Sequence, residues 1–385
     1  MLFAKLNDLS IGGKGAYGIA ASAVERKADL PTYLRITDIF DDGTLNLSEL
    51  KSVDAPNSDK YLLKPNDIVF ARTGGSTGRN YFYDGSDGVF VYAGFLIKFS
   101  IDPEKVNPKY VKYYCRSKQY NDWVQSFNTG STRGNINAQT FGNMEIPLPE
   151  RKQQDYLVSI LEPIDEKIKN NKQVNDNLQQ QAMSLYAEMF LNSSDSNVTS
   201  GTLSDIAVIT MGQSPSGSSY NEDGVGEVFY QGRAEFGFRF PKRRLFTTEP
   251  KRMAEAGDVL LSVRAPVGDL NIAYERCCIG RGLGAIHSKT GHSSFILYTM
   301  FALRSQLDVF NGEGTVFGSI NRDALNAIPI DIPPVTEIDQ FEVVAHPIDE
   351  LIRANYEENC RLEAIRDSLL PKLMSGEIDV SDIQL

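Results

Sequence analysis

Apolar side chains recur in one helical register in two separate stretches of the chain, residues 146–190 and 330–374. In both stretches the apolar and asparagine positions are spaced alternately by four and three residues, which keeps them on one side of a helix and is typical of a coiled coil. We expect the two helices to pack against each other in antiparallel orientation. The alternative is a pair of amphipathic helices, each lying on a separate domain core. The seam positions are Leu157, Leu161, Ile164, Ile168, Asn171, Asn175 and Leu178 in the first stretch, and Phe341, Ile348, Ile352, Asn355, Asn359 and Leu362 in the second.

The two stretches are copies of each other. Shifting the first by 184 positions places it on the second without a gap, so that Gly134 and Asp165 fall on Gly318 and Asp349. A repeat of this length describes two large halves rather than a solenoid. We therefore divide the chain into a first body (residues 1–145), a first helical arm with a linker (146–199), a second body (200–333) and a second arm with a C-terminal tail (334–385).

Polar and proline residues interrupt both arms. Each seam contains two asparagines near its middle, which cost stability but penalise wrong registers and partner numbers. Proline inside a helix removes a hydrogen bond and clashes with the preceding turn. Because the seam continues through Pro163 and Pro347, we expect a kink there, or a tight junction between a short helix and a long one. Arg366 stands in the second seam where the first has Ala182, so we expect this end to be looser or to face a partner.

Both bodies combine short strands with helices. Polar and apolar residues alternate in DIVFAR and FLIKFS of the first body, which predicts strands. The second body repeats the order, with AGDVLLSVRAPVG in place of NDIVFARTGGSTG. A helical pattern and a Gly-rich loop follow in each body, before the arm. The sequence therefore predicts a mixed α/β (α+β) fold: two α/β bodies separated by two long helices that form an antiparallel coiled coil, with an internal pseudo-two-fold repeat.

Charge and cysteine content narrow the class of protein. The net charge of −11 lies in the arms, at −3 and −8, whereas the bodies carry +1 and −1. Near-neutral bodies leave room for a basic face, and the acidic arms favour protein partners or solvent over phosphate. No apolar run reaches the about 18 residues of a membrane span, and the N-terminus lacks the apolar core of a secretion signal. The four cysteines lack zinc-ligand spacing, so we expect reduced thiols, no metal and a cytoplasmic protein.

No catalytic motif is visible. Residues 331–335 (DIPPV) superficially resemble the Asp/Asn-Pro-Pro-aromatic motif of DNA amino-methyltransferases, but an extra residue splits the motif and the aromatic is missing. Residues 74–78 (GGSTG) lack the lysine and the spacing of a P-loop. We find no HExxH motif, and no Ser/His/Asp arrangement with supporting context. We therefore expect no catalytic residue and no cofactor in this chain.

Recognition chemistry is visible in loops that combine arginine with Gly, Ser, Thr, Asn and Gln. Arginine matches the guanine edge with two hydrogen bonds, Asn or Gln match adenine, and Lys and backbone N–H groups hold phosphates. For any single residue an ordinary solvated position is the simpler interpretation, but the clusters 72–79 and 239–244 favour DNA contact. The candidates are Arg72, Gly75, Ser76, Thr77, Arg79, Ser131, Arg133 and Asn135 in the first body, and Gln213, Ser214, Gln231, Arg233, Arg239, Lys242, Arg243, Arg244 and Arg264 in the second.

Longer motifs resemble a known family. The arm openings are IPLPERKQQDYLVSILEPIDEKI and IPPVTEIDQFEVVAHPIDELI, and LLPKLMSGEIDV follows near the C-terminus. In this order, and in a duplicated frame, they resemble the specificity subunit of a type I restriction–modification enzyme. The stretches YGIAASAVERKADLPTYLRITDI, VITMGQSPSGSSYN, FYQGRAEFG and GDVLLSVRAPVGDLNIA are similar to openings and loops of that family's target-recognition domains. The resemblance covers nearly the whole chain.

The resemblance implies a division of labour. Each body would be a target-recognition domain that reads one half of a bipartite DNA sequence, and the antiparallel arms would fix the spacer between the halves. Two methyltransferase subunits, which carry S-adenosylmethionine, would clamp on the arms, and restriction and translocase subunits that hydrolyse ATP would join them. This chain would supply specificity without catalysis. Three alternatives are a role in another, type IIB-like modification system, a coiled-coil scaffold that spaces two ligand-binding modules unrelated to DNA, and a cryptic enzyme.

Overall fold

The chain forms two compact units. The computed structural model describes residues 2–127, 134–192, 198–312 and 318–378. Unit 1 comprises residues 1–169 and 359–385, and unit 2 comprises residues 170–358. Each unit therefore combines one body with a part of both arms, so the unit boundaries cross the arms instead of following the four segments of the sequence.

Over its described residues, unit 1 contains a two-stranded sheet and two four-stranded sheets. In the first, β1 (Leu2–Lys5) pairs antiparallel with β10 (Glu145–Leu148). The second has the order β2-β9-β6-β7 and the third the order β3-β5-β4-β8, in which β4 and β8 are parallel. All five positions of β6 are buried, because Ile68 and Phe70 pack in one hydrophobic core and Val69 and Ala71 pack in another. The strands are β2 (Ala16–Tyr17), β3 (Ala23–Val24), β4 (Thr32–Leu34), β5 (Lys51–Val53), β6 (Asp67–Ala71), β7 (Asn80–Tyr83), β8 (Phe90–Tyr92) and β9 (Leu96–Ser100).

Short helices connect the sheets of unit 1 to its arm. Asn107 accepts a hydrogen bond from the Lys109 N–H and so caps α1 (Pro108–Tyr114). The helices α2 (Lys118–Gln125) and α3 (Ala138–Gly142) follow. Apolar side chains from β6, these helices and both arms share one core, which includes Phe70, Tyr110, Phe141, Leu161 and Leu370.

Over its described residues, unit 2 repeats this arrangement. The strand β11 (Thr199–Thr202) pairs antiparallel with β21 (Pro329–Ile332), as β1 does with β10. The sheet β12-β20-β17-β18 matches β2-β9-β6-β7, and the third sheet, β13-β15-β14-β19-β16, has one strand more than its counterpart. The strands are β12 (Ala207–Met211), β13 (Tyr220–Asn221), β14 (Glu227–Tyr230), β15 (Phe246–Thr247), β16 (Met253–Ala254), β17 (Val259–Ser262), β18 (Leu270–Ile272), β19 (Cys277–Ile279) and β20 (Leu283–Ser288).

The helices of unit 2 occur in the same order as those of unit 1. The asparagine that caps α3 in unit 1, Asn137, has a counterpart in Asn321, which caps α8, and each side chain accepts a hydrogen bond of 2.9 Å from a backbone N–H. Apolar side chains from the β12-β20-β17-β18 sheet, α6 and both arms form the core around Phe295, Phe341 and Ala345. The helices are α5 (Leu203–Ile206), α6 (Ser293–Ala302), α7 (Arg304–Asp308) and α8 (Arg322–Asn326).

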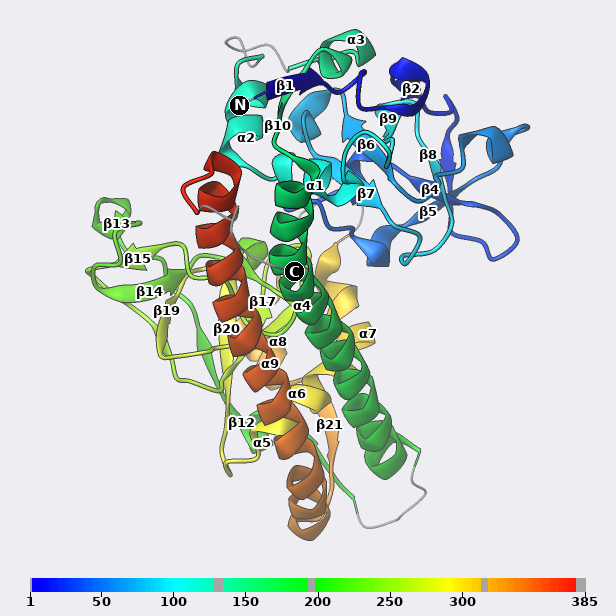
Figure 1. Cartoon of the computed structure of the whole chain (residues 1–385). Coiled ribbons are helices and arrows are strands. Elements are labelled where there is room, and N and C mark those ends of the chain that lie inside the picture. The colour runs from blue at the N-terminus through cyan, green and yellow to red at the C-terminus, as the bar shows by residue number, and fades with distance from the viewer. Residues whose placement is uncertain (1, 128–133, 193–197, 313–317, 379–385) are drawn as a thin grey trace. The chain divides into compact units, whose positions relative to one another are not determined.

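Each arm is a single long helix. Figure 1 shows α4 (Arg151–Tyr186) and α9 (Val335–Ser375) as unbroken ribbons, and a short π-helix (Ala187–Leu191) follows α4. The helices run through Pro163 and Pro347, so neither proline marks a junction between a short helix and a long one. Unit 1 contains the first part of α4 and the last part of α9, and unit 2 contains the last part of α4 and the first part of α9. The two helices are therefore antiparallel, as predicted.

Polar contacts show this antiparallel pairing inside unit 2. The Asn355 side chain donates to Asn175 Oδ1 over 2.8 Å, and Asn171 donates to Glu358 over 2.8 Å. In the seam Leu157, Leu161, Ile168, Asn171, Asn175, Phe341, Ile352 and Asn359 are buried, whereas Ile164, Leu178, Ile348, Asn355 and Leu362 are half-buried. Asn171, Asn175 and Asn355 therefore form hydrogen bonds between the two helices.

Arg366 does not loosen the seam in unit 1. Its side chain is largely buried, and its Nη1 lies 3.2 Å from Asp165 Oδ1 on the facing helix. The arginine therefore contributes an ion pair between α9 and α4 at the end that we expected to be looser or to face a partner.

Three further observations concern membrane spans, cysteines and metal sites among the described residues. None of their helices is both long enough and apolar enough to cross a membrane. All four cysteines are free thiols, and Cys360 is the exposed one. Among the described residues, His, Cys, Asp and Glu form no group of three that would hold a metal ion.

Candidate nucleic-acid interface

In unit 1, the end of β6 is hydrogen-bonded to two other segments. The Arg72 N–H donates to Phe95 O over 3.1 Å, and the Ile136 N–H donates to Arg72 O over 2.9 Å. The Gly18 N–H donates to Leu96 O over 3.2 Å, which adds the segment after β2. Backbone hydrogen bonds thus join four stretches that are up to 118 residues apart in the sequence.

The loop after β6 lies against the Gly-rich loop of the same unit. Thr73 forms an antiparallel bridge with Asn135, and the Thr77 hydroxyl donates to Gly134 O over 2.8 Å. Two of the predicted contact segments are therefore neighbours. Of the candidates here, Gly75 and Asn135 are exposed, and Arg72, Ser76, Thr77 and Arg79 are half-buried. Ser131 and Arg133 lie outside the described residues.

The two arginines of this loop differ in their surroundings. The Arg72 guanidinium carbon lies 5.2 Å from the centre of the Tyr17 ring, and no ion pair involves Arg72 among the described residues. In contrast, Arg79 Nε lies 2.6 Å from Asp41 Oδ1, and Arg79 Nη1 donates to Ile39 O over 3.1 Å. Arg79 is thus neutralised within its own body, whereas the charge of Arg72 lies beside an aromatic face and has no acidic partner among the described residues.

Unit 2 has the same junction in spite of a different sequence. The Val263 N–H donates to Gly282 O over 3.0 Å, the Ile320 N–H donates to Val263 O over 3.1 Å, and the Gly212 N–H donates to Leu283 O over 2.9 Å. These three bonds correspond one by one to those of unit 1. The junction therefore belongs to the repeated frame.

Several predicted contact residues of unit 2 meet at this junction. The Gln213 N–H donates to Ile279 O over 3.0 Å, and the Gly282 N–H donates to Gln231 O over 3.3 Å. Arg264 forms a bridge with Ser319 of the Gly-rich loop. The side chains of Gln213, Gln231 and Arg264 are exposed and make no hydrogen bond or ion pair among the described residues, and half-buried Ser214 accepts from the Arg281 N–H over 3.2 Å.

Arg239 corrects the prediction for the cluster 239–244. Only 2% of its side chain is exposed, and its Nη1 lies 3.0 Å from Asp349 Oδ1 on α9. Its guanidinium carbon also lies 5.8 Å from the centre of the Tyr298 ring. The prediction that Arg239 contacts DNA is therefore wrong, because its charge is used inside unit 2. Phe240, which follows Arg239 in the sequence, is buried as well.

The remaining basic residues of this cluster, residues 242–244, are exposed, and two of the three have acidic partners. Arg243 forms an ion pair with Glu275, and Arg244 lies 2.9 Å from Glu235. The hydrogen bond to Glu235 raises the pKa of Arg244. Lys242 is exposed and has no such partner among the described residues. Lys242 therefore remains the free cation of this cluster, within the described part of unit 2.

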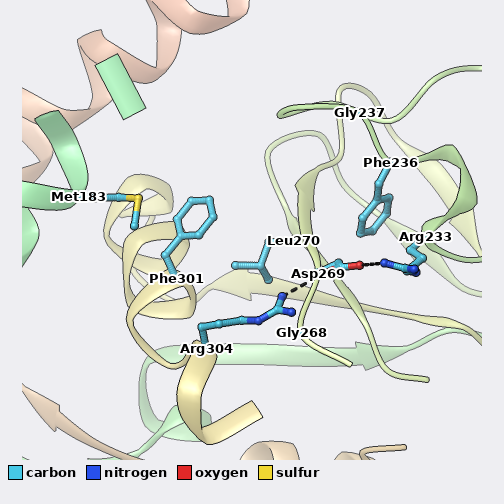
Figure 2. Close-up of a pocket in the computed structure, with 9 residues that line it drawn as sticks. All are labelled: Met183, Arg233, Phe236, Gly237, Gly268, Asp269, Leu270, Phe301 and Arg304. Carbon is cyan, nitrogen blue, oxygen red and sulfur yellow. Dashed lines mark hydrogen bonds and ion pairs between the residues drawn. The ribbon is translucent and has the colours of Figure 1, made fainter. Parts of the chain in front are cut away.

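Arg233 lies at the edge of a cavity of about 490 Å³. Figure 2 shows Asp269 between Arg233 and Arg304, with Phe301 and Leu270 among the apolar residues of the wall. Asp269 pairs with both arginines. A DNA phosphate would therefore have to displace the Asp269 carboxylate before it could bind either arginine.

Comparison with known proteins places the chain in a family. The model of the type I restriction modification DNA specificity domain matches residues 25–180 and again residues 195–359. The chain belongs to this family. It is 30% identical over 343 residues to a putative type I restriction enzyme MjaX specificity subunit of Methanocaldococcus jannaschii, covering 83% of this chain and 80% of that protein.

Two further relatives agree with this assignment. The type I restriction enzyme MjaIX specificity subunit of the same organism is 22% identical over 315 residues, which is 74% of this chain and 72% of that protein. The crystal structure of a type I restriction-modification system S subunit from M. genitalium has a TM-score of 0.57 at 17% identity and covers 97% of this chain and 95% of that one. This structural likeness concerns the fold.

The sequence analysis missed one segment of these specificity domains. The turn that precedes β20, residues 280–283, carries exposed Arg281 and adjoins Gln213, Gln231 and Arg264 through the hydrogen bonds given above. The equivalence of the two turns was hard to see in the sequence, because GLGAIHSK and GFLIKFS match at their first glycines. In the strands, however, Leu283 pairs with Ser262, and Leu96 pairs with Ala71. The strand register therefore aligns Leu283 with Leu96, which differs by one position from the match of the glycines.

Proposed function

We propose that this chain is the DNA sequence-recognition subunit of a type I restriction–modification complex, in which each specificity domain reads one half of a bipartite double-stranded DNA target. The observation that carries the proposal is the junction at the ends of β6 and β17. Its backbone hydrogen bonds recur in both units, whereas the exposed side chains that it presents differ. A constant backbone arrangement that presents different side chains is suited to reading a different DNA sequence in each unit.

The long helices have a separate role in this proposal. They set the spacer between the two half-sites and provide docking sites for two methyltransferase subunits. The acidic composition of both arms supports a protein-facing role, because like charges repel the phosphates of DNA.

Catalysis belongs to the partner subunits in this proposal. The methyltransferase subunits carry S-adenosylmethionine, and restriction and translocase subunits that hydrolyse ATP join the complex. This chain holds no cofactor and acts in the cytoplasm. The sequence supports this role in that it contains none of the catalytic motifs considered above.

The proposal is tested by expressing the chain with its neighbouring methyltransferase gene in a host without other adenine methylation, and by reading methylated bases by single-molecule sequencing. A split motif with one methylated adenine in each half is the expected result. A stable complex without new methylation would contradict the assignment of an active specificity subunit. Failure of any complex to form would favour a scaffold unrelated to DNA.

The helices can be tested separately. Inserting one heptad at matched positions of α4 and α9 lengthens each helix by about 10 Å, because a helix rises 1.5 Å per residue. The preferred spacer should change while both half-sites stay the same. A change in the half-site sequences with an unchanged spacer would exclude the spacer role of the helices.

A further inference from the structure

A four-residue turn occupies the same place in both units. Residues 93–96 (turn 1) connect β8 to β9, and residues 280–283 (turn 2) connect β19 to β20. The Leu96 N–H donates to Ala93 O over 2.8 Å, and the Leu283 N–H donates to Gly280 O over 2.9 Å. The turns are therefore structural equivalents with two central positions each: Gly94 and Phe95 in turn 1, Arg281 and Gly282 in turn 2.

At one central position of each turn, the neighbouring backbone leaves little room for a side chain. In turn 1, a Cβ on Gly94 would lie 3.2 Å from Ile19 O and 3.4 Å from Ala20 Cα. In turn 2, a Cβ on Gly282 would lie 2.8 Å from Gln231 O. Neighbouring backbone thus closes one central position in unit 2 and leaves little room at the other central position in unit 1. The side chain that remains at the centre of the turn is Phe95 in unit 1 and Arg281 in unit 2.

Both side chains point to a function outside the fold. Phe95 is 59% exposed, although the backbone around it is hydrogen-bonded into the junction. Arg281 is exposed and makes no side-chain hydrogen bond or ion pair among the described residues, whereas Arg233, Arg243 and Arg244 of the same unit all have acidic partners.

Each turn also lies among the candidate contact residues of its own unit. Phe95 O accepts from the Arg72 N–H, and Gly282 O accepts from the N–H of Val263, which precedes Arg264. The Arg281 N–H donates to the Ser214 hydroxyl over 3.2 Å. A duplex that reached Arg72 or Arg264 would therefore meet the side chain at the centre of the adjoining turn.

We propose that Phe95 and Arg281 are base-contacting residues that determine sequence specificity, one in each half-site. This inference rests on the proposed function. Arg281 has the two-pronged donor geometry that fits the O6 and N7 acceptors of guanine, and Phe95 supplies an apolar surface for the methyl group of thymine. The two units thus use different central positions of one turn to read different bases.

The experiment uses the full complex with its methyltransferase subunits and the methylation motif as readout. In Arg281→Ala, one base of the half-site read by unit 2 should lose its discrimination by roughly ten- to hundredfold, while the other half-site stays unchanged. In Phe95→Ala, a base of the half-site read by unit 1 should become less discriminated, by a smaller factor. The matched control is Arg276→Ala, because Arg276 is an arginine of the same unit that is paired with Glu227 and Glu255.

Arg281→Lys separates base reading from charge and from folding. Lysine keeps the positive charge but loses the planar fork, so relaxed discrimination at the same base supports the proposal even if the alanine variant fails to assemble. An unchanged motif and an unchanged methylation rate in the alanine or the lysine variant would overturn it. If the unmodified complex produced no split motif, the proposed function itself would fail and this inference with it.

Discussion

The two units fix an equivalent aspartate of the repeated helices in different ways. Asp165 on α4 lies 2.8 Å from Arg116, 3.2 Å from Lys112 and 3.2 Å from Arg366, all within unit 1. Asp349, its counterpart 184 positions later on α9, has one cation among the described residues, Arg239, at 3.0 Å. One aspartate therefore has three cations around it and the other has one.

A tyrosine is common to both sites, whereas the source of the cations is not. The Tyr113 hydroxyl donates to Asp165 over 3.0 Å, and the Tyr298 hydroxyl donates to Asp349 over 2.8 Å. Lys112 and Arg116 come from α1 and its C-terminal end, but Arg239 comes from a loop between β14 and β15. The repeat thus preserved the carboxylate and the phenol, and each body supplied its own positive charge.

The difference affects stability, because a buried charge that loses its partner lowers the free energy of unfolding. In unit 1, removal of one cation leaves two. In unit 2, removal of Arg239 leaves a carboxylate whose side chain is only 13% exposed. The same position is therefore redundant in one unit and dependent on a single residue in the other.

The largest effect is expected for Arg239→Ala. The free energy of unfolding of unit 2 should fall by about 3–5 kcal/mol, because the substitution leaves Asp349 without its cation. The single tryptophan, Trp123, lies in unit 1, so its fluorescence follows that unit while circular dichroism follows both units. In urea, the transition seen by circular dichroism should move ahead of the Trp123 transition.

The control removes both charges of this pair. Arg239→Met combined with Asp349→Leu should regain most of the lost stability, since an apolar pair of similar volume avoids the desolvation cost. If Arg239→Ala left both transitions coincident and unshifted, the buried pair would contribute little and the contrast between the units would disappear.

The second effect is a pH dependence in unit 1. Burial disfavours the charge of Asp165 and is the largest single influence, but Arg116, Lys112 and Arg366 outweigh it and lower the pKa of Asp165 to about 2. Because the folded pKa lies below the ordinary value of 3.8, the stabilisation is complete above about pH 4 and is lost as the pH falls towards 2. Its size is roughly 2 kcal/mol.

This dependence is measured by urea unfolding with Trp123 fluorescence at several values between pH 5 and pH 2. The Asp165→Asn variant should be less stable than the parent at pH 5, and the two should converge towards pH 2. A constant difference over this range would mean that the three cations do not hold the carboxylate in its charged form. Burial lowers the pKa of Lys112, and Arg116 adds to this.

The helices and strands were predictable where a local pattern determines them. The four-three spacing from Leu157 to Leu178 identified α4 because a helix buries one face whatever lies opposite. The alternation in DIVFAR identified β6 for a similar reason. Pro163 and Pro347 were harder, since the packing of the seam overrides the local preference of proline and keeps each helix continuous.

The candidate site was less predictable because it depends on pairs that are distant in sequence. Arg239 resembles a DNA contact in its local sequence, and only Asp349, 110 residues later, shows that it is internal. Likewise, Arg79 is neutralised by Asp41. Phe95 and Arg281 required the register of β6 with β9 and of β17 with β20 before it was visible that they lie at the two central positions of equivalent turns. An unpaired, exposed side chain is a property of the folded surface.

The turns allow a third test of how the units differ. Gly282→Ala should cost about 1–2 kcal/mol, because the new methyl group meets the Gln231 carbonyl at 2.8 Å and backbone must shift. Gly94→Ala should cost less, since its nearest contact is 3.2 Å. The comparison is made by thermal unfolding of both variants beside the parent. Equal effects would show that the two closures are equivalent, and the argument for different open positions would weaken.

The smallest effect is expected for Arg366→Ala. Asp165 keeps Arg116 and Lys112 when Arg366 is removed, so the loss should be about 1 kcal/mol, the net value of one hydrogen bond. Alanine suits this register, because its repeat counterpart Ala182 is fully buried in unit 2. Unfolding followed by Trp123 fluorescence measures the change, and Arg366→Met, which keeps the length of the stem, separates lost packing from lost charge. A loss as large as that of Arg239→Ala would mean that the three cations act as one unit, so that their number gives unit 1 no redundancy.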